Sequence, residues 1–194
     1  MIGAPKVCLM PHINTLAAER AALVIIDMQE AFRPTMADFG EVAARIAVVA
    51  RAVQLLDVPV IVTEQYPKGL GHTAVEIRDA LPPTFEPVEK TAFSSCGAAE
   101  FVARLEATGA RQIIVCGIEA HICINQTTHD LLARGYQVHL LEACISARDA
   151  DNKQAALAKM RHSGALPCAV EMALFELMRD ARHEQFKAVQ NLIK

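Results

Sequence analysis

A three-layer α/β/α sandwich around a six-stranded, mostly parallel sheet is the fold class that this sequence predicts. Short apolar runs without a polar break recur along the 194 residues, and such runs are typical of strands buried on both faces. Between them lie stretches with apolar residues at steps of three and four, the spacing of an amphipathic helix. Strands that alternate with helices in this way favour a parallel sheet covered on both faces.

The first half of the chain contains three expected strands, at residues 22–27, 60–63 and 87–90. The first is an apolar run that ends in Asp27, and the third carries Lys90 at its end. A helix begins near Asp38 and ends before Pro59, so the first two strands form a β-α-β unit. Residues 64–72 contain one proline and two glycines and are expected to form a long loop.

The second half of the chain contains three further expected strands, at residues 112–116, 136–141 and 168–170. Four helical segments lie between and after them, at residues 97–108, at 121–133, from 149 onward and from 171 to 194. Ser94 or Ser95 can cap the first of these helices. The pattern predicts one Rossmann-like domain over residues 1–194, with right-handed crossovers and a site outside the carboxyl ends of the strands.

Composition and charge narrow the class of partner. The formal net charge is -3 and the pI is near 6.2, without a basic stripe, which argues against nucleic acid or an anionic membrane and favours a small-molecule substrate. Hydrophobic residues make up 53% of the chain, yet no apolar run approaches the ~20 residues of a membrane span. The apolar excess is expected in the buried sheet or in the interface of a homo-oligomer, a dimer or larger.

The six cysteines show neither a CxxC pair nor the spacing of a zinc site. We therefore expect reduced thiols, no metal and no cofactor. The N-terminal residues lack the pattern of a secretory signal, so a cytoplasmic location is expected, with an organellar address left open. Cys116 and Cys144 are expected in the core, whereas Cys96 near a helix start and Cys8 in a loose terminus could be reactive without being catalytic.

Three segments with polar residues reach the same edge of the predicted sheet. Asp27 ends the first strand, Lys90 ends the third, and the turn from Gly117 to Cys123 follows the fourth. Cys123 lies in the first turn of a predicted helix, where free N–H groups and the helix dipole favour an anion. We therefore expect its thiol to lose a proton more readily than a buried thiol does.

These residue types can perform nucleophilic catalysis. Cys123 would be the nucleophile, Asp27 the base that takes its proton and later returns it, and Lys90 the cation that offsets their repulsion. The backbone N–H groups of Glu119 and Cys123 are expected to stabilise the oxyanion. The side chains expected to line the substrate pocket are those of Phe32, Tyr66, Phe93 and Glu119. The three aromatic rings could instead simply pack.

Three motifs together resemble the isochorismatase-like superfamily. They are Ile25-Ile-Asp27-Met-Gln29, Glu89-Lys90-Thr-Ala-Phe93 and Gly117-Ile-Glu-Ala-His-Ile-Cys123, and their order and spacing match over nearly the whole chain. The cysteine members of the superfamily include nicotinamidases and carbamoylsarcosine amidohydrolases. The resemblance implies a Cys-Asp-Lys triad, a thioester intermediate and hydrolysis of a C–N bond. It also implies a cis peptide bond between Ile118 and Glu119.

The segment after the second strand departs from the nicotinamidase pattern. Nicotinamidases carry an Asp-x-His metal cluster there, whereas residues 64–71 lack that spacing and look like the isochorismatase domain-containing subgroup. Nicotinamide as substrate and a bound metal are therefore both in doubt. True isochorismatases cleave a vinyl ether and do not need the cysteine, so Cys123 argues for a different reaction.

Several plainer interpretations compete with this one. Taken alone, Cys123 could be a core residue, Asp27 a helix cap or the partner of an arginine, and Lys90 a surface lysine. A Cys-His dyad with His121 is less favoured, because residues two apart on a helix do not face each other. A dinucleotide-binding domain would need glycines in the turn after the first strand, and residues 27–30 contain none. A catalytically silent member that acts in binding or assembly remains an alternative.

Overall fold

A computed structural model describes residues 12–194. Its six strands are β1 (Ala21–Ile26), β2 (Val60–Gln65), β3 (Val88–Lys90), β4 (Gln112–Gly117), β5 (Gln137–Ile145) and β6 (Leu166–Cys168). They form one sheet in the order β3-β2-β1-β4-β5-β6, and every neighbouring pair is parallel. The predicted sandwich around a six-stranded sheet is confirmed.

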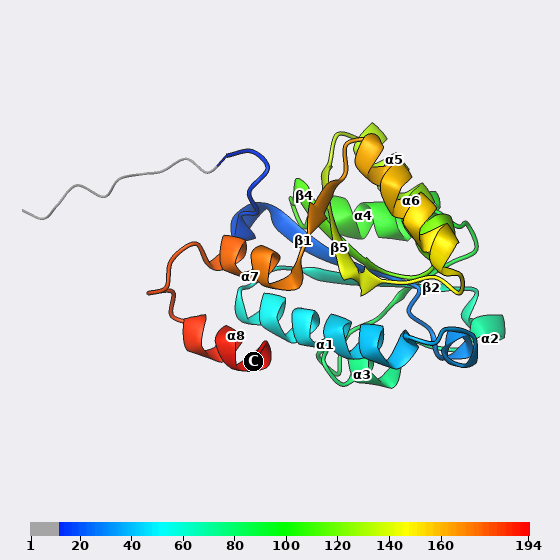
Figure 1. Cartoon of the computed structure of the whole chain (residues 1–194), viewed down its shortest axis with the longest axis horizontal. Helices are drawn as coiled ribbons and strands as arrows, with labels where there is room; N and C mark the ends of the chain where they lie inside the picture. Colours follow the sequence, from blue (N-terminus) through cyan, green and yellow to red (C-terminus); the bar gives the residue numbers. More distant parts are fainter. Residues whose placement is uncertain (1–11) are drawn as a thin grey trace, which may run out of the picture.

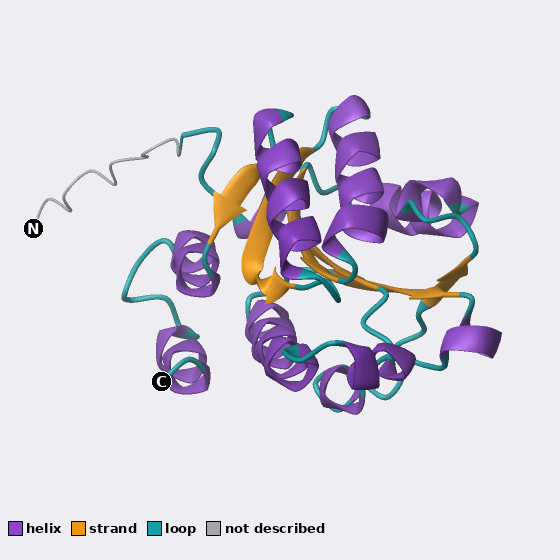
Figure 2. Ribbon diagram, turned by 45° about the vertical axis from the view of Figure 1, so that its right-hand side comes forward, coloured by secondary structure: helices purple, strands orange, loops and turns teal. Residues whose placement is uncertain are grey.

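Helices cover both faces of the sheet (Figures 1 and 2). The α-helices are α1 (Phe39–Leu55), α2 (Pro67–Leu70), α3 (Val75–Arg78), α4 (Ala99–Ala107), α5 (Asn125–Ala133), α6 (Ala150–His162), α7 (Val170–Met178) and α8 (Phe186–Leu192). Short 3-10 helices are η1 (Ala18–Arg20), η2 (Glu30–Thr35) and η3 (Ser95–Gly97), and η4 (Ala120–Ile124) is a π-helix. None of the helices in residues 12–194 has both the length and the apolar character needed to cross a membrane.

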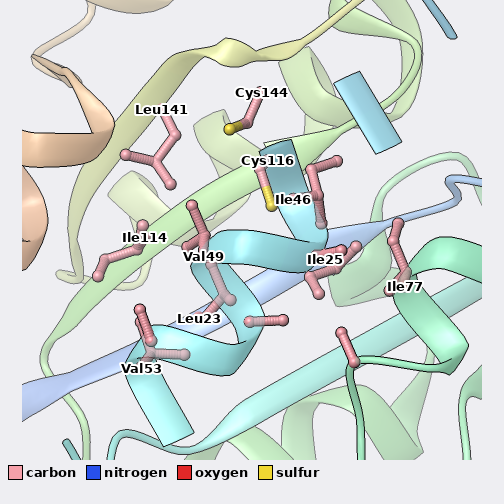
Figure 3. Close-up of a cluster of buried hydrophobic side chains, with 14 of the residues drawn as sticks. Leu23, Ile25, Ile46, Val49, Val53, Ile77, Ile114, Cys116, Leu141 and Cys144 are labelled. Atoms are coloured by element: carbon pink, nitrogen blue, oxygen red, sulfur yellow. The ribbon is translucent and has the colours of Figure 1, made fainter. Parts of the chain in front are cut away.

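Two apolar clusters lie on the opposite faces of the sheet. Helices α1, α3, α7 and α8 pack on one face, where Leu23, Ile25 and Cys116 meet Ile46 and Val49 of α1 (Figure 3). Helices α4, α5 and α6 pack on the other face. All six residues of β1 and all six of β4 are buried, which explains their unbroken apolar sequences.

The last strand lies two residues earlier than predicted. The structure places β6 at Leu166–Cys168 and starts α7 at Val170, so the expected strand at residues 168–170 is wrong. Pro167 is tolerated in β6 because this strand is at the edge of the sheet, where one side of the backbone needs no ladder hydrogen bond. The C-terminal helical segment is also divided into α7 and α8.

The carboxyl ends of the strands bring the polar segments to one edge. Asp27 follows β1 directly, Lys90 ends β3, and Gly117 ends β4. Gly117 has φ +117, and a Cβ atom there would lie 2.0 Å from the Ile26 carbonyl oxygen. Only glycine allows β4 to end this close to β1.

Candidate active site

Asp27 lies at the centre of a buried polar group. Its side chain is 2% exposed, and its backbone adopts φ +50, which turns the chain away at the end of β1. The Thr63 hydroxyl donates to Oδ1 at 2.7 Å, and the Lys90 ammonium donates to Oδ2 at 2.6 Å. Both carboxylate oxygens therefore have a fixed donor.

Lys90 reaches Asp27 from β3, across β2. Its side chain is fully buried, and Nζ also donates to Gln65 Oε1 at 2.7 Å and to the carbonyl oxygens of Ala92 at 3.2 Å and Phe93 at 3.0 Å. A buried ammonium needs such acceptors, because burial removes it from water. The alternative of a surface lysine is therefore wrong.

Thr63, Gln65 and Gln29 complete this group, although none of them was predicted from the sequence to have a role in the site. Gln29 Oε1 accepts from the Gln65 backbone at 2.7 Å, and Gln29 Nε2 donates to the carbonyl oxygens of Gln65 and Gly71. The amide of Gln29 thus ties the end of β2 to the chain after β1. Polar residues two apart at the end of an apolar strand share one face, and this spacing is the signal that could have found Thr63 and Gln65.

The turn after β4 is held by main-chain contacts on both sides. Ile118 N donates to Ile26 O at 2.9 Å, Ser146 N donates to Gly117 O at 3.2 Å, and Ala120 N donates to Ser146 O at 2.8 Å. The Ile118–Glu119 peptide bond is cis. Within the described residues, the Glu119 N–H donates to no protein acceptor. This N–H therefore remains able to bind a ligand atom.

Cys123 lies in η4, beside the carboxylate and the ammonium, and is 7% exposed. Burial, followed by the negative charge of Asp27, raises the pKa of the Cys123 thiol to about 12, while the charge of Lys90 lowers it. Hydrogen bonding to Asp27 and Lys90 acts on this pKa in the same two directions. The structure thus brings Cys123, Asp27 and Lys90 together.

The expectation of an easily ionised Cys123 is wrong. A helix start favours a thiolate, but desolvation and the adjacent carboxylate outweigh that effect here. Burial also raises the pKa values of Cys144 and Cys168 to about 12 and that of Cys96 above its usual range. Cys116 and Cys144 are fully buried, as in the core interpretation, whereas Cys8 lies outside the described residues.

The expected pocket residues are spread around this group. Phe93 is 55% exposed and Tyr66 54% exposed, and both adjoin Lys90 through their main chains. Phe32 packs against the apolar cluster on the α1 face. The Glu119 carboxylate is 4% exposed and accepts from Arg148 N at 3.1 Å and Arg148 Nε at 3.0 Å, rather than from Lys90.

His121 and the segment after β2, which was compared from the sequence with the metal cluster of nicotinamidases, have within the part that the structure describes other partners than the buried polar group or none. His121 has a buried Nδ1 without a partner in the described part of the chain. The Glu64 carboxylate accepts from Thr73 N and Oγ1, each at 2.7 Å, and lies 3.1 Å from His72 Nδ1. Among residues 12–194, no three His, Cys, Asp or Glu side chains are grouped to hold a metal ion.

Comparison with known proteins identifies the family and agrees with the fold. Residues 21–172 match the family model described as the isochorismatase domain. Mouse isochorismatase domain-containing protein 2A is 40% identical over 185 residues, which cover 94% of this chain and 86% of that protein. The structure of the MAR1 ribonuclease from Caenorhabditis elegans superposes with a TM-score of 0.87 at 35% identity and covers 92% of each chain.

A more distant structure shares the fold alone. The YcaC gene product of Escherichia coli, described as an octameric hydrolase of unknown specificity, is 19% identical, with a TM-score of 0.79 and coverage of 94% of this chain and 96% of that one. The matched residues 21–172 include Asp27, Lys90 and Cys123. On the family match and the relatives of similar length, this chain belongs to the isochorismatase family.

Proposed function

We propose that this protein is a cysteine hydrolase that cleaves a C–N, amide-type bond of a small molecule through a thioester on Cys123. The observation that carries the proposal is the buried Asp27–Lys90 ion pair beside the Cys123 thiol. A cysteine that only packs in the core needs no charged neighbours. A nucleophilic cysteine needs a base to take its proton and a charged group that holds this base in place. Two buried charges are also costly to retain for packing alone.

The first half of the proposed reaction forms the thioester. Because the pKa of Cys123 is raised to about 12, the thiol keeps its proton at neutral pH, and Asp27 takes this proton as sulfur attacks the carbonyl carbon. The carbonyl electron pair moves onto oxygen, where the N–H groups of Glu119 and Cys123 stabilise it. When the pair returns, the C–N bond breaks and Asp27 gives its proton to the leaving nitrogen.

The second half hydrolyses the thioester. Asp27 takes a proton from water as the water oxygen attacks the thioester carbon, and the same N–H groups stabilise the second oxyanion. Collapse breaks the C–S bond, releases the acid product and returns the proton to Cys123. Lys90 stays protonated throughout, and it orients Asp27 through the 2.6 Å contact and offsets the negative charge near sulfur.

The net charge and the exposed apolar side chains support a class of substrate and an oligomeric state. A small-molecule substrate suits the net charge of -3 better than RNA, although a relative in C. elegans is described as a ribonuclease. The exposed Met172 and Phe175, three residues apart on α7, support assembly into a homo-oligomer, and the octameric E. coli structure is a precedent in the same fold. One domain over residues 1–194 and a cytoplasmic location stay predictions.

Limiting alkylation by iodoacetamide, mapped by peptide mass spectrometry, tests the proposal. We expect Cys123 to be labelled at neutral pH and its labelling rate to fall by at least about tenfold in Asp27→Asn. Asp27→Asn removes a charge that raises the pKa of Cys123, but it also removes the base that takes the thiol proton, and we expect the loss of the base to dominate. Lys90→Met should also slow it, because Lys90 lowers the pKa of Cys123. The half-buried Cys96, which lies near Asp130 and Arg134 instead, is the internal reference and should label equally in all variants.

A catalytically silent role is the second candidate, and the burial of the thiol favours it. Cys123 is only 7% exposed, and its pKa is as high as that of the core residue Cys144. A silent protein would leave Cys123 unlabelled while Cys96 reacts, or would label it equally with and without Asp27. Either result would contradict the hydrolase proposal; the expected pattern would justify a screen of small amides.

A further inference from the structure

A buried carboxylate adjoins the proposed oxyanion site and takes no part in the proposed chemistry. The backbone of Glu119 supplies one of the proposed N–H donors. Glu119 lies in the turn that leads to Cys123, and its side chain is 4% exposed. An unpaired negative charge there would oppose the negative charge that develops on the substrate oxygen. At low effective dielectric such repulsion is strong over a few ångströms.

Arg148 pairs with this carboxylate from the segment between β5 and α6. Its backbone N and its Nε both donate to Glu119 Oε2, at 3.1 and 3.0 Å. The charge of Glu119 and its hydrogen bonds raise the pKa of Arg148, so the guanidinium stays charged. The Arg148 side chain is 54% exposed, which places the compensating cation at the solvent side of a buried anion.

The backbone of the turn does not depend on this ion pair. Ser146 N and O bind Gly117 O and Ala120 N, and Ser146 Oγ donates to Asp38 Oδ1 at 2.6 Å. None of these contacts involves the Arg148 side chain. The charge of Glu119 and the path of the turn can therefore be separated by mutation.

We propose that Arg148 is a positioning residue that draws the Glu119 carboxylate toward solvent and neutralises it, so that the Glu119 N–H can stabilise an oxyanion. The inference rests on the proposed function. It predicts that Arg148 affects two kinds of reaction at the Cys123 sulfur differently. Acylation of Cys123 passes through an oxyanion, whereas alkylation by iodoacetamide is a displacement at carbon that forms none. Loss of the Arg148 side chain should therefore slow the acylation of Cys123 and leave the rate of its alkylation nearly unchanged.

The experiment compares the two rates at Cys123 in the full-length protein. Acylation is followed as the burst of p-nitrophenolate from p-nitrophenyl acetate, with Cys123→Ala as the blank, and alkylation by iodoacetamide is followed by peptide mass spectrometry. In Arg148→Met we expect the ratio of acylation to alkylation to fall about tenfold, because the Glu119 charge is no longer neutralised. In Glu119→Gln/Arg148→Met the ratio should recover to within about threefold of the original protein, since no charge remains.

Two further variants make the result specific. Glu119→Gln alone keeps the backbone N–H and removes the anion, so it should lower the ratio by less than Arg148→Met does. Arg161→Met is the matched control: Arg161 is a 46% exposed arginine on α6 whose guanidinium lies 3.6 Å from Glu142, and its loss should leave the ratio unchanged.

Each remaining outcome contradicts a stated claim. An unchanged ratio in Arg148→Met, or equal losses in both reactions, would overturn the role of Arg148. A loss in Glu119→Gln as large as that in Arg148→Met would also overturn it, because the contact rather than the charge would then matter. A Cys123 that neither reagent modifies in the original protein would overturn the proposed function, and the inference with it.

Discussion

Lys90 and Asp27 show how a single buried charge depends on its neighbours. Their side chains are 0% and 2% exposed, and the ammonium has four acceptors within 3.2 Å. Taking two charges out of water costs several kcal/mol per ion, and good geometry can offset this cost. Removing either partner leaves the other buried without compensation.

Replacing Lys90 by Met should therefore destabilise the fold markedly. We expect Lys90→Met to lower the free energy of unfolding by about 3–5 kcal/mol, measured by urea denaturation. Arg182→Met is the control: it removes an exposed ion pair with Asp180 and should have little effect on the free energy of unfolding. Equal losses of unfolding free energy in the two variants would mean that burial of the Asp27–Lys90 ion pair does not affect stability.

The catalytic candidates could be named from the sequence because each lies at the end of an expected strand or in the turn that follows one. Asp27 follows an apolar run, Lys90 ends a short strand that begins at Pro87, and a glycine ends the strand before the Cys123 turn. Thr63 and Gln65 belong to a strand without such a marker, and their role depends on which strand lies beside β1. That pairing is decided by packing rather than by local sequence.

At the scale of elements, the closeness of β1 and β4 decides the shape of the site. Gly117 sits where β4 turns toward Cys123, and its φ of +117 is one that residues with a side chain rarely adopt. A Cβ atom would also lie 2.7 Å from Ile26 N and 2.8 Å from Ile26 C. Because these are backbone atoms between two paired strands, they cannot move aside cheaply.

Gly117→Ala should thus lower the free energy of unfolding more than a glycine-to-alanine substitution that introduces backbone strain without a clash. We expect thermal and urea denaturation to show a loss above about 4 kcal/mol, from the clash and the strain together. Gly164→Ala is the matched control, since Gly164 has φ +103 but no heavy atom within 4 Å of an added Cβ. Its loss should stay at about 1–3 kcal/mol. A loss in Gly117→Ala no larger than in the control would contradict the close approach of β1 and β4.

Edge strands were harder to predict than central ones. The central strands β1 and β4 have six buried residues each and were found within about one residue of their bounds from their apolar runs. β6 has three residues, contains Pro167 and pairs with β5 alone. Its position depends on the register with β5, in which His139 faces Leu166, so local sequence could not determine it.

At the scale of the whole molecule, the burial of His139 makes stability depend on pH. His139 lies on β5, is 2% exposed and is 3.2 Å from Gln137 Oε1. Burial lowers the pKa of His139 from its usual 6.5 to about 4, because the protonated ring would lose its hydration. The folded protein therefore keeps a neutral imidazole where the unfolded chain would already take up a proton.

Stability should fall as the pH drops through this window. Between pH 6.5 and 4 the unfolded chain binds more protons at His139 than the folded protein does, so the free energy of unfolding decreases by up to about 3 kcal/mol. His139→Gln should flatten this part of the pH profile in urea denaturation, whereas His162→Gln on α6 should not. The same slope in His139→Gln and in the original protein would rule out this residue as the cause.

The sequence by itself determined the layers of the fold and the three candidate catalytic residues. Apolar runs mark strands buried on both faces, and the residues that end such strands meet at one edge of a parallel sheet. Only the tertiary structure decided the state of the Cys123 thiol, the acceptors of Lys90 and the pairing of Glu119 with Arg148. These properties depend on desolvation and on contacts between segments far apart in the chain. A local sequence pattern specifies neither of these.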